Sequence, residues 1–200
     1  MNLLARDGWI FDLDGTLTVA AHDFDAIRVE LDLPPGEPIL EALDALPAVD
    51  AAPRRVRLLE IERELAHEAK PALGAAPLLA MLSECHAQLG ILTRNDRELA
   101  RITLAACGLA EHFEPAHILG REEAQPKPSP DGVQRLQRAW GLSPERSVMV
   151  GDFLFDLQAG RRAGAAAVWV DSTGEGTHAD QADLTVRSLE ALRQLLVGAV

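Results

Sequence analysis

The chain has 200 residues, enough for one domain of ordinary size or a core with a modest insertion, and its 48% apolar and 25% charged residues are typical of a soluble globular protein. Its formal net charge of −12 argues against binding to duplex nucleic acid or to an anionic membrane surface, because both need clustered lysine and arginine. The sequence shows no signal peptide, membrane span or CxxC pair, so we expect a cytoplasmic protein whose cysteines stay reduced.

Six short apolar runs predict β-strands, in chain order at 8–13, 88–93, 116–119, 147–151, 166–170 and, more weakly, 184–186. Helical patterns lie between or after them, at 74–86, 95–107, 129–140, 156–163 and 188–197. Asn95 is the predicted N-cap of the second of these helices, with Glu98 three residues further on. The strands are apolar throughout rather than alternating, as expected when helices cover both faces of a sheet. The order predicts an α/β fold with a doubly wound, parallel, Rossmann-like sheet.

Residues 18–71 interrupt this alternation. They contain no convincing strand but three helical stretches, at about 23–32, 38–46 and 53–69, joined by proline-rich loops at 33–38 and 46–53. We interpret the segment as a small all-helical cap inserted after the first strand. The chain then divides into an α/β core, residues 1–17 and 72–200, and a helical cap, residues 18–71.

Polar side chains follow the predicted strands, where ligands collect in a doubly wound sheet. They are Asp12 and Asp14 after the first strand, Thr93 after the second, Asp152 and Asp156 after the fourth, and Lys127 between two prolines ahead of a helix. Taken singly, each has an ordinary structural interpretation, since Asp-Gly is a common turn and an isolated lysine is usually solvated.

Taken together, these residues favour phosphoryl transfer. Four carboxylates near one sheet edge need a cation, and oxygen ligands without histidine or cysteine select Mg²⁺. A lysine and a hydroxyl beside them suit the oxygens of an anionic substrate, and phosphoryl transfer depends on such positioning and charge neutralisation. The sequence has no GxxxxGK[ST] phosphate loop and no GxGxxG after its first strand.

Four motifs resemble those of the haloacid dehalogenase-like hydrolase superfamily, in its phosphoglycolate phosphatase and β-phosphoglucomutase-like branch with a small helical cap. They are DLDGT (12–16), the threonine of ILTRN (91–95), the lysine of PKPSP (126–130) and GDFLFD (151–156), in the order and spacing of the family. The resemblance covers the whole chain, with residues 18–71 in the place of the cap.

The resemblance implies a role for each matching residue. Asp12 would be the nucleophile that forms an aspartyl-phosphate, and Asp14 the general acid and then the general base. Mg²⁺ would be held by the Asp12 carboxylate, the Asp14 main-chain carbonyl and Asp152, with support from Asp156. Thr93 and Lys127 would bind phosphate oxygens, and Lys127 would also hold the nucleophile.

Further substrate-binding candidates rest on weaker signals. Arg94 directly follows Thr93, where many members of the family have a small or amide residue, and Asn95 comes next. Arg94 either faces an anionic substrate group or lies against the surface. In the cap, His22 and Arg28 lie closest after the first motif and are our first candidates for substrate contact.

We therefore expect a Mg²⁺-dependent phosphatase that acts on a small phosphorylated metabolite. The alternatives are a sugar phosphomutase of the β-phosphoglucomutase type and a phosphate-binding module with weak catalysis. Asp14 argues against a dehalogenase, because a halide leaving group needs no proton whereas an alkoxide does. Phe153 and Phe155 are expected to pack in the core, and the 4% aromatic content gives no support for nucleobase recognition.

Overall fold

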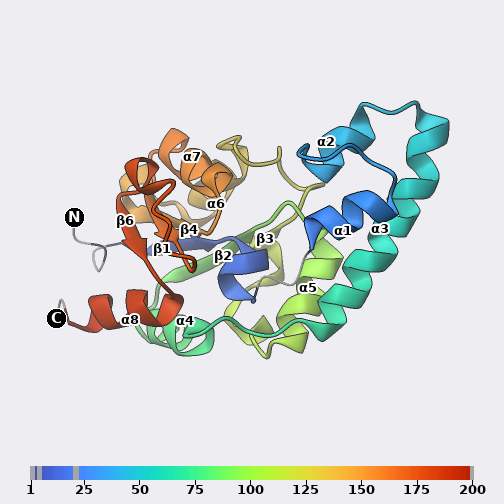
Figure 1. The fold of residues 1–200 in the computed structure, drawn as a ribbon. Coiled ribbons are helices and arrows are strands. Elements are labelled where there is room, and N and C mark those ends of the chain that lie inside the picture. The colour runs from blue at the N-terminus through green and yellow to red at the C-terminus, as the bar shows by residue number, and fades with distance from the viewer. Residues whose placement is uncertain (1–2, 4–5, 20–22, 199–200) are drawn as a thin grey trace.

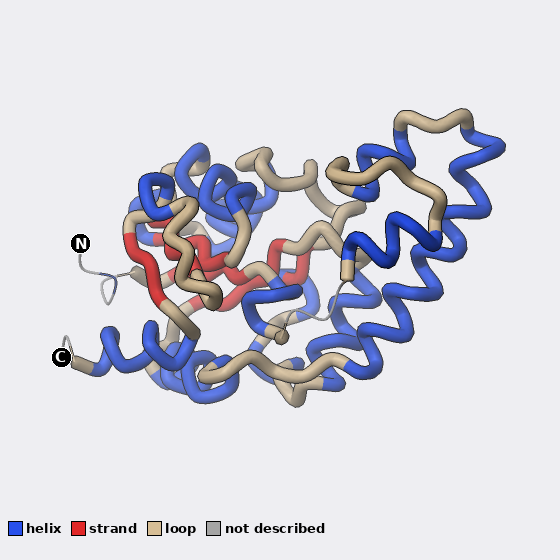
Figure 2. The backbone as a smooth tube through the Cα atoms, in the orientation of Figure 1, coloured by secondary structure: helices blue, strands red, loops and turns tan. Residues whose placement is uncertain are grey.

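The computed structural model describes residues 3, 6–19 and 23–198 (Figures 1 and 2). Its centre is a parallel sheet in the order β3-β2-β1-β4-β5-β6. The strands are β1 (Gly8–Phe11), β2 (Gln88–Leu92), β3 (Ile118–Leu119), β4 (Ser147–Gly151), β5 (Ala166–Val170) and β6 (Leu184–Val186). All six predicted strands and the parallel, doubly wound α/β fold are confirmed.

Helices cover both faces of the sheet because alternate strand residues point to opposite sides. Trp9 and Phe11 of β1 face a cluster that includes α4 (Ala75–Glu84), α5 (Arg97–Ala106) and α8 (Leu189–Val197). Ile10, between them, packs in a second cluster with α6 (Asp131–Trp140) and α7 (Leu154–Arg162) on the other face. Burial on both faces explains why the strands carry continuous apolar runs.

Three further helices lie together beyond the carboxyl end of β1 (Figure 1): α1 (Phe24–Glu30), α2 (Ile39–Asp44) and α3 (Ala48–Glu68). They share a hydrophobic cluster of their own, which includes Ile27, Leu43 and Leu58 and is separate from the clusters on the sheet. The long helix α3 also packs against α5. The two chain segments that join these helices to the rest meet in an antiparallel bridge between Thr18 and Pro71.

Two local predictions were wrong. Helix α3 begins at Ala48 rather than at residue 53, so most of the predicted loop at 46–53 is helical. Pro53 is exposed in this helix, and a proline near the N-terminal end removes only one backbone hydrogen bond there. The N-cap of α5 is Asp96 rather than Asn95, since the Asp96 carboxylate accepts from the amide nitrogens of Glu98 at 2.8 Å and Leu99 at 3.3 Å.

Candidate active site

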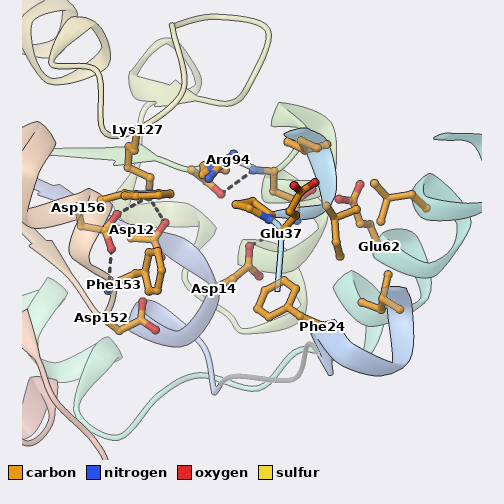
Figure 3. A pocket seen from close by; sticks show the side chains of 18 of the residues that line it. Asp12, Asp14, Phe24, Glu37, Glu62, Arg94, Lys127, Asp152, Phe153 and Asp156 are labelled. Atoms are coloured by element: carbon orange, nitrogen blue, oxygen red, sulfur yellow. Dashed lines mark hydrogen bonds and ion pairs between the residues drawn. The ribbon is translucent and has the colours of Figure 1, made fainter. Parts of the chain in front are cut away.

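The ends of β1, β2 and β4 open into one pocket of about 450 Å³, which α1–α3 border on the far side (Figure 3). Six residues predicted at the ends of strands or ahead of a helix line it together: Asp12, Asp14, Thr93, Lys127, Asp152 and Asp156. The predicted Arg28, Arg94 and Asn95 also line it. Because β1 lies between β2 and β4 in the sheet, parallel strands far apart in sequence bring these side chains to one edge.

Lys127 links two of the aspartates. Its ammonium lies 2.5 Å from Oδ1 of Asp12 and 2.6 Å from Oδ1 of Asp156, and its side chain is only 4% exposed (Figure 3). Burial lowers the pKa of Lys127, but the two carboxylates outweigh it, so that the pKa lies above its ordinary value. The lysine is therefore a fixed positive charge in the floor of the pocket.

Two glycines make room for the aspartates. Gly15 has a φ of +88°, and a Cβ there would lie 2.4 Å from Oδ2 of Asp152. A Cβ on Gly151 would lie 2.3 Å from the side chain of Asp156. The hydroxyl of Thr16 also donates to Oδ1 of Asp152 at 2.9 Å. The small residues of the first and last motifs thus allow the carboxylates to approach one another.

Asp12, Asp152 and Asp156 each place a carboxylate oxygen within 4.8 Å of the others. Burial is the main cause that raises the pKa of all three carboxyls, to about 6 for Asp156. The positive charge of Lys127 acts in the opposite direction but offsets only part of this effect. Three carboxylate oxygen donors, two from buried residues and one from the half-buried Asp152, carry an excess of negative charge and match the ligands that Mg²⁺ prefers. The residues present therefore fit a divalent cation of this type, and the side chain of Asp14 lies outside this group.

Asp14 is instead held from the loop that follows β2. The amide nitrogen of Asn95 donates to Oδ2 of Asp14 at 3.4 Å, and the backbone N–H of Asn95 donates to Oγ1 of Thr93 at 3.0 Å. Burial raises the pKa of Asp14 despite the opposing effects of Asn95 and Lys127. A carboxyl with a raised pKa holds a proton more readily, which suits an acid that must give one up.

The other predicted substrate contacts have different outcomes. Arg94 lines the pocket, but its guanidinium is paired with Glu41 of α2 and lies 5.5 Å from the centre of the Phe155 ring. Arg28 also lines the pocket and is paired with Asp25 at 2.6 Å. His22 lies outside the described residues.

Several lining residues were not predicted. Phe24, Glu37 and Glu62 come from the helical segment, where no motif marks a side chain that faces the pocket. The expectation that Phe153 packs in the core was wrong: its ring is 54% exposed and lines the pocket. Its place directly after Asp152 was the signal available in the sequence.

The sequence profile of the haloacid dehalogenase-like hydrolases matches residues 33–170. A haloacid dehalogenase-like hydrolase domain-containing protein of Arabidopsis thaliana is 30% identical over 94% of this chain and 83% of its own length. The chain belongs to the haloacid dehalogenase-like hydrolase family. The predicted resemblance is confirmed.

Two further proteins are similar to this chain over nearly its whole length. A phosphoglycolate phosphatase of Chromobacterium violaceum is 28% identical over 98% of this chain and 99% of its own. The crystal structure of a hydrolase from Pseudomonas syringae superposes with a TM-score of 0.80, covering 96% of this chain and 99% of that one at 22% identity. The names of the relatives support the predicted enzyme class, a phosphoric monoester hydrolase. Among the described residues, no helix combines the length and hydropathy needed to cross a bilayer.

Proposed function

We propose that the protein is a Mg²⁺-dependent phosphatase that hydrolyses a small phosphorylated metabolite through an aspartyl-phosphate on Asp12. The contact of Lys127 with both Asp12 and Asp156, beside Asp152, is the observation that carries this proposal. A phosphatase among the full-length relatives supports it.

Asp12, Asp152 and the main chain of Asp14 would hold Mg²⁺, with Asp156 in support. The ion, when bound, would neutralise charge on the carboxylates and on the phosphoryl oxygens. Lys127 would add a second positive charge beside Asp12. The Thr93 hydroxyl accepts its hydrogen bond from Asn95, so its own proton is left for a phosphate oxygen.

Lys127 holds Oδ1 of Asp12, which leaves Oδ2 to attack phosphorus. The bond from phosphorus to the ester oxygen breaks as the Asp12–phosphorus bond forms, and Asp14 gives its proton to the departing alkoxide. Asp14, now a carboxylate, takes a proton from the water that attacks the aspartyl-phosphate. Inorganic phosphate leaves, and both aspartates return to their starting states.

We also propose that residues 1–17 and 72–200 form the catalytic core and residues 18–71 a cap. The separate hydrophobic cluster of α1–α3, their position over the pocket and the paired linkers at Thr18 and Pro71 support this division. A cap in this position would exclude water and contact the leaving group.

The test is hydrolysis of p-nitrophenyl phosphate by the wild type, Asp12→Asn and Asp50→Asn, each with Mg²⁺ and with EDTA. Asp50 is an exposed residue of α3 that does not line the pocket, so it is a matched control. We expect activity in the wild type and Asp50→Asn with Mg²⁺ only, and none in Asp12→Asn.

Full activity of Asp12→Asn would contradict the role of Asp12 as the nucleophile. Full activity in EDTA would contradict the requirement for Mg²⁺. Incubation with a set of sugar phosphates, followed by analysis of the products, distinguishes a phosphomutase from a phosphatase. Isomerised sugar phosphate without release of inorganic phosphate would replace the phosphatase with a mutase.

A further inference from the structure

Two phenylalanine rings are exposed at the pocket. Phe153 is 54% and Phe24 is 53% exposed, and both line the pocket, one from the loop between β4 and α7 and the other from the start of α1. In Figure 3 they lie on either side of Asp14 in the view. An exposed ring forgoes the free energy of burial, so large exposed apolar groups gathered at one place mark a binding surface.

The ring of Phe153 is held in a fixed orientation. It makes edge-to-face contacts with Phe155, at 5.0 Å and 86° between rings, and with His178, at 6.4 Å and 85°. Its backbone N–H donates to Oδ2 of Asp156 at 3.0 Å. A half-exposed ring that is held by two neighbouring rings and through its main chain can bind an apolar group at little cost in conformational entropy.

The helical side of the pocket presents further apolar side chains alongside Arg28, Glu37 and Glu62. Besides Phe24, it is lined by Ile27, Ile39, Leu40 and Leu58. A leaving group that extends from the phosphoryl site towards α1–α3 therefore meets hydrocarbon on two sides.

The charges of the pocket disfavour a second anion. Its lining contains six acidic residues and three basic ones. Each basic side chain already has an acidic partner: Lys127 has two aspartates, Arg28 has Asp25 and Arg94 has Glu41. A negative group on the alcohol would therefore enter a pocket in which carboxylates outnumber basic side chains and each basic charge is already balanced by an acidic one.

We infer, on the basis of the proposed phosphatase function, that the substrate is a phosphate monoester whose leaving group is uncharged and has a flat apolar face, and that Phe153 and Phe24 bind that face. Arylalkyl alcohols represent this class. Esters whose alcohol carries a carboxylate or a second phosphate belong to the disfavoured class.

The experiment measures kcat/KM of the Mg²⁺-loaded protein for ethyl phosphate, benzyl phosphate and 4-carboxybenzyl phosphate. The two benzyl esters differ mainly in the distant charge. We expect benzyl phosphate to exceed each of the other two by about tenfold, the size of effect that one aromatic contact or one unfavourable charge produces.

Phe153→Ala and Phe24→Ala test the rings, and Val29→Ala is the control, because Val29 is an exposed apolar residue of α1 that does not line the pocket. We expect either phenylalanine variant to lower the benzyl-to-ethyl ratio of kcat/KM several-fold and the control to keep it. A partly misfolded variant loses both activities equally, so the ratio still reports on the ring.

The outcomes separate the two proposals. Hydrolysis that favours 4-carboxybenzyl phosphate would mean that Arg94 or Arg28 binds the carboxylate, and it would overturn this inference while the phosphatase stands. An unchanged benzyl-to-ethyl ratio in both phenylalanine variants would do the same. If the protein hydrolyses none of the three esters and no p-nitrophenyl phosphate, the proposed phosphatase function is overturned and this inference with it.

Discussion

Lys127 is the residue on which the charge balance of the site depends, because it contacts both Asp12 and Asp156 and is almost fully buried. Replacing it with methionine keeps the length of the side chain but leaves the carboxylates facing each other. We expect Lys127→Met to lower kcat by about 10²-fold or more, as the loss of one electrostatic group does in other enzymes. We also expect the free energy of unfolding in EDTA to fall by about 3 kcal/mol, because the carboxylates lose their partner.

Lys70→Met is the control, since Lys70 is exposed and does not line the pocket. Turnover of p-nitrophenyl phosphate and urea unfolding measure the two effects. Wild-type turnover in Lys127→Met would remove the lysine from the mechanism.

The sequence predicted which core residues meet at the site, but it did not predict their partners in the helical segment. Asp12, Thr93 and Lys127 follow strands or precede a helix of a parallel sheet, and the edge at which such strands end follows from the fold. Glu41, the partner of Arg94, comes from α2. Nothing in the periodicity of a short helix says which core loop it will lie against, so this contact could not be predicted.

The start of α5 shows how two adjacent polar residues divide their roles. Asp96 caps the helix, while Asn95 turns towards Asp14 and accepts a hydrogen bond from the backbone of Asp96 at 2.7 Å. We expect Asp96→Ala to lower the free energy of unfolding by about 1 kcal/mol, the usual cost of an N-cap, with kcat close to the wild type. Asn95→Ala should lower kcat more than Asp96→Ala does. The reverse order in kcat would contradict the role of Asn95 in positioning Asp14.

The segment after β5 is organised by Asp171, which accepts from the backbone nitrogens of Gly174 at 2.8 Å and Gly176 at 3.1 Å and from the hydroxyl of Thr173 at 3.1 Å. Burial raises the pKa of Asp171, but these hydrogen bonds outweigh it and hold the pKa below its ordinary value. Because its pKa is lower in the folded state than in the unfolded chain, the carboxylate stabilises the fold at pH values above the unfolded-state pKa. This stabilisation is lost as the pH falls through the folded-state pKa.

We therefore expect Asp171→Asn to be less stable than the wild type at pH 7. The difference should shrink as the pH falls below about 4, the ordinary pKa of an aspartate. Thermal unfolding of both proteins between pH 7 and pH 3 measures it. A difference that stays constant over this range would assign the loss to packing rather than to charge.

The elements with strong patterns were predicted well, and the error at α3 has a physical reason. A proline is usually taken as a boundary because it cannot donate a backbone hydrogen bond. At Pro53 the bond lost lies close to the start of a helix of 21 residues, in which Leu58 and Ile61 are buried. Tertiary packing of this kind outweighs a local propensity, and a single sequence does not report it.

At the scale of the whole molecule, two ion pairs of different kinds between described residues join the helical segment to the core. Arg94 and Glu41 are 22% and 50% exposed, so that water and salt screen their attraction. Arg121 and Glu62 are 21% and 11% exposed and share two hydrogen bonds, at 3.2 and 3.1 Å. Glu62 also lines the pocket, so the second pair joins α3 to the core beside the proposed chemistry.

Arg121→Gln removes the charge that balances Glu62 and leaves that carboxylate largely buried. We expect the free energy of unfolding to fall by about 2 kcal/mol, less than for a fully buried pair because Arg121 is partly solvated. We also expect faster proteolysis between residues 18 and 71, since α3 loses its polar contact with the core, and little change in these effects in 0.5 M salt.

Arg101→Gln, which breaks the exposed pair with Glu98, is the control and should change stability by less than about 0.5 kcal/mol. Equal stability and equal proteolysis of the two variants would mean that the ion pair of Arg121 with Glu62 does not hold the helical segment in place.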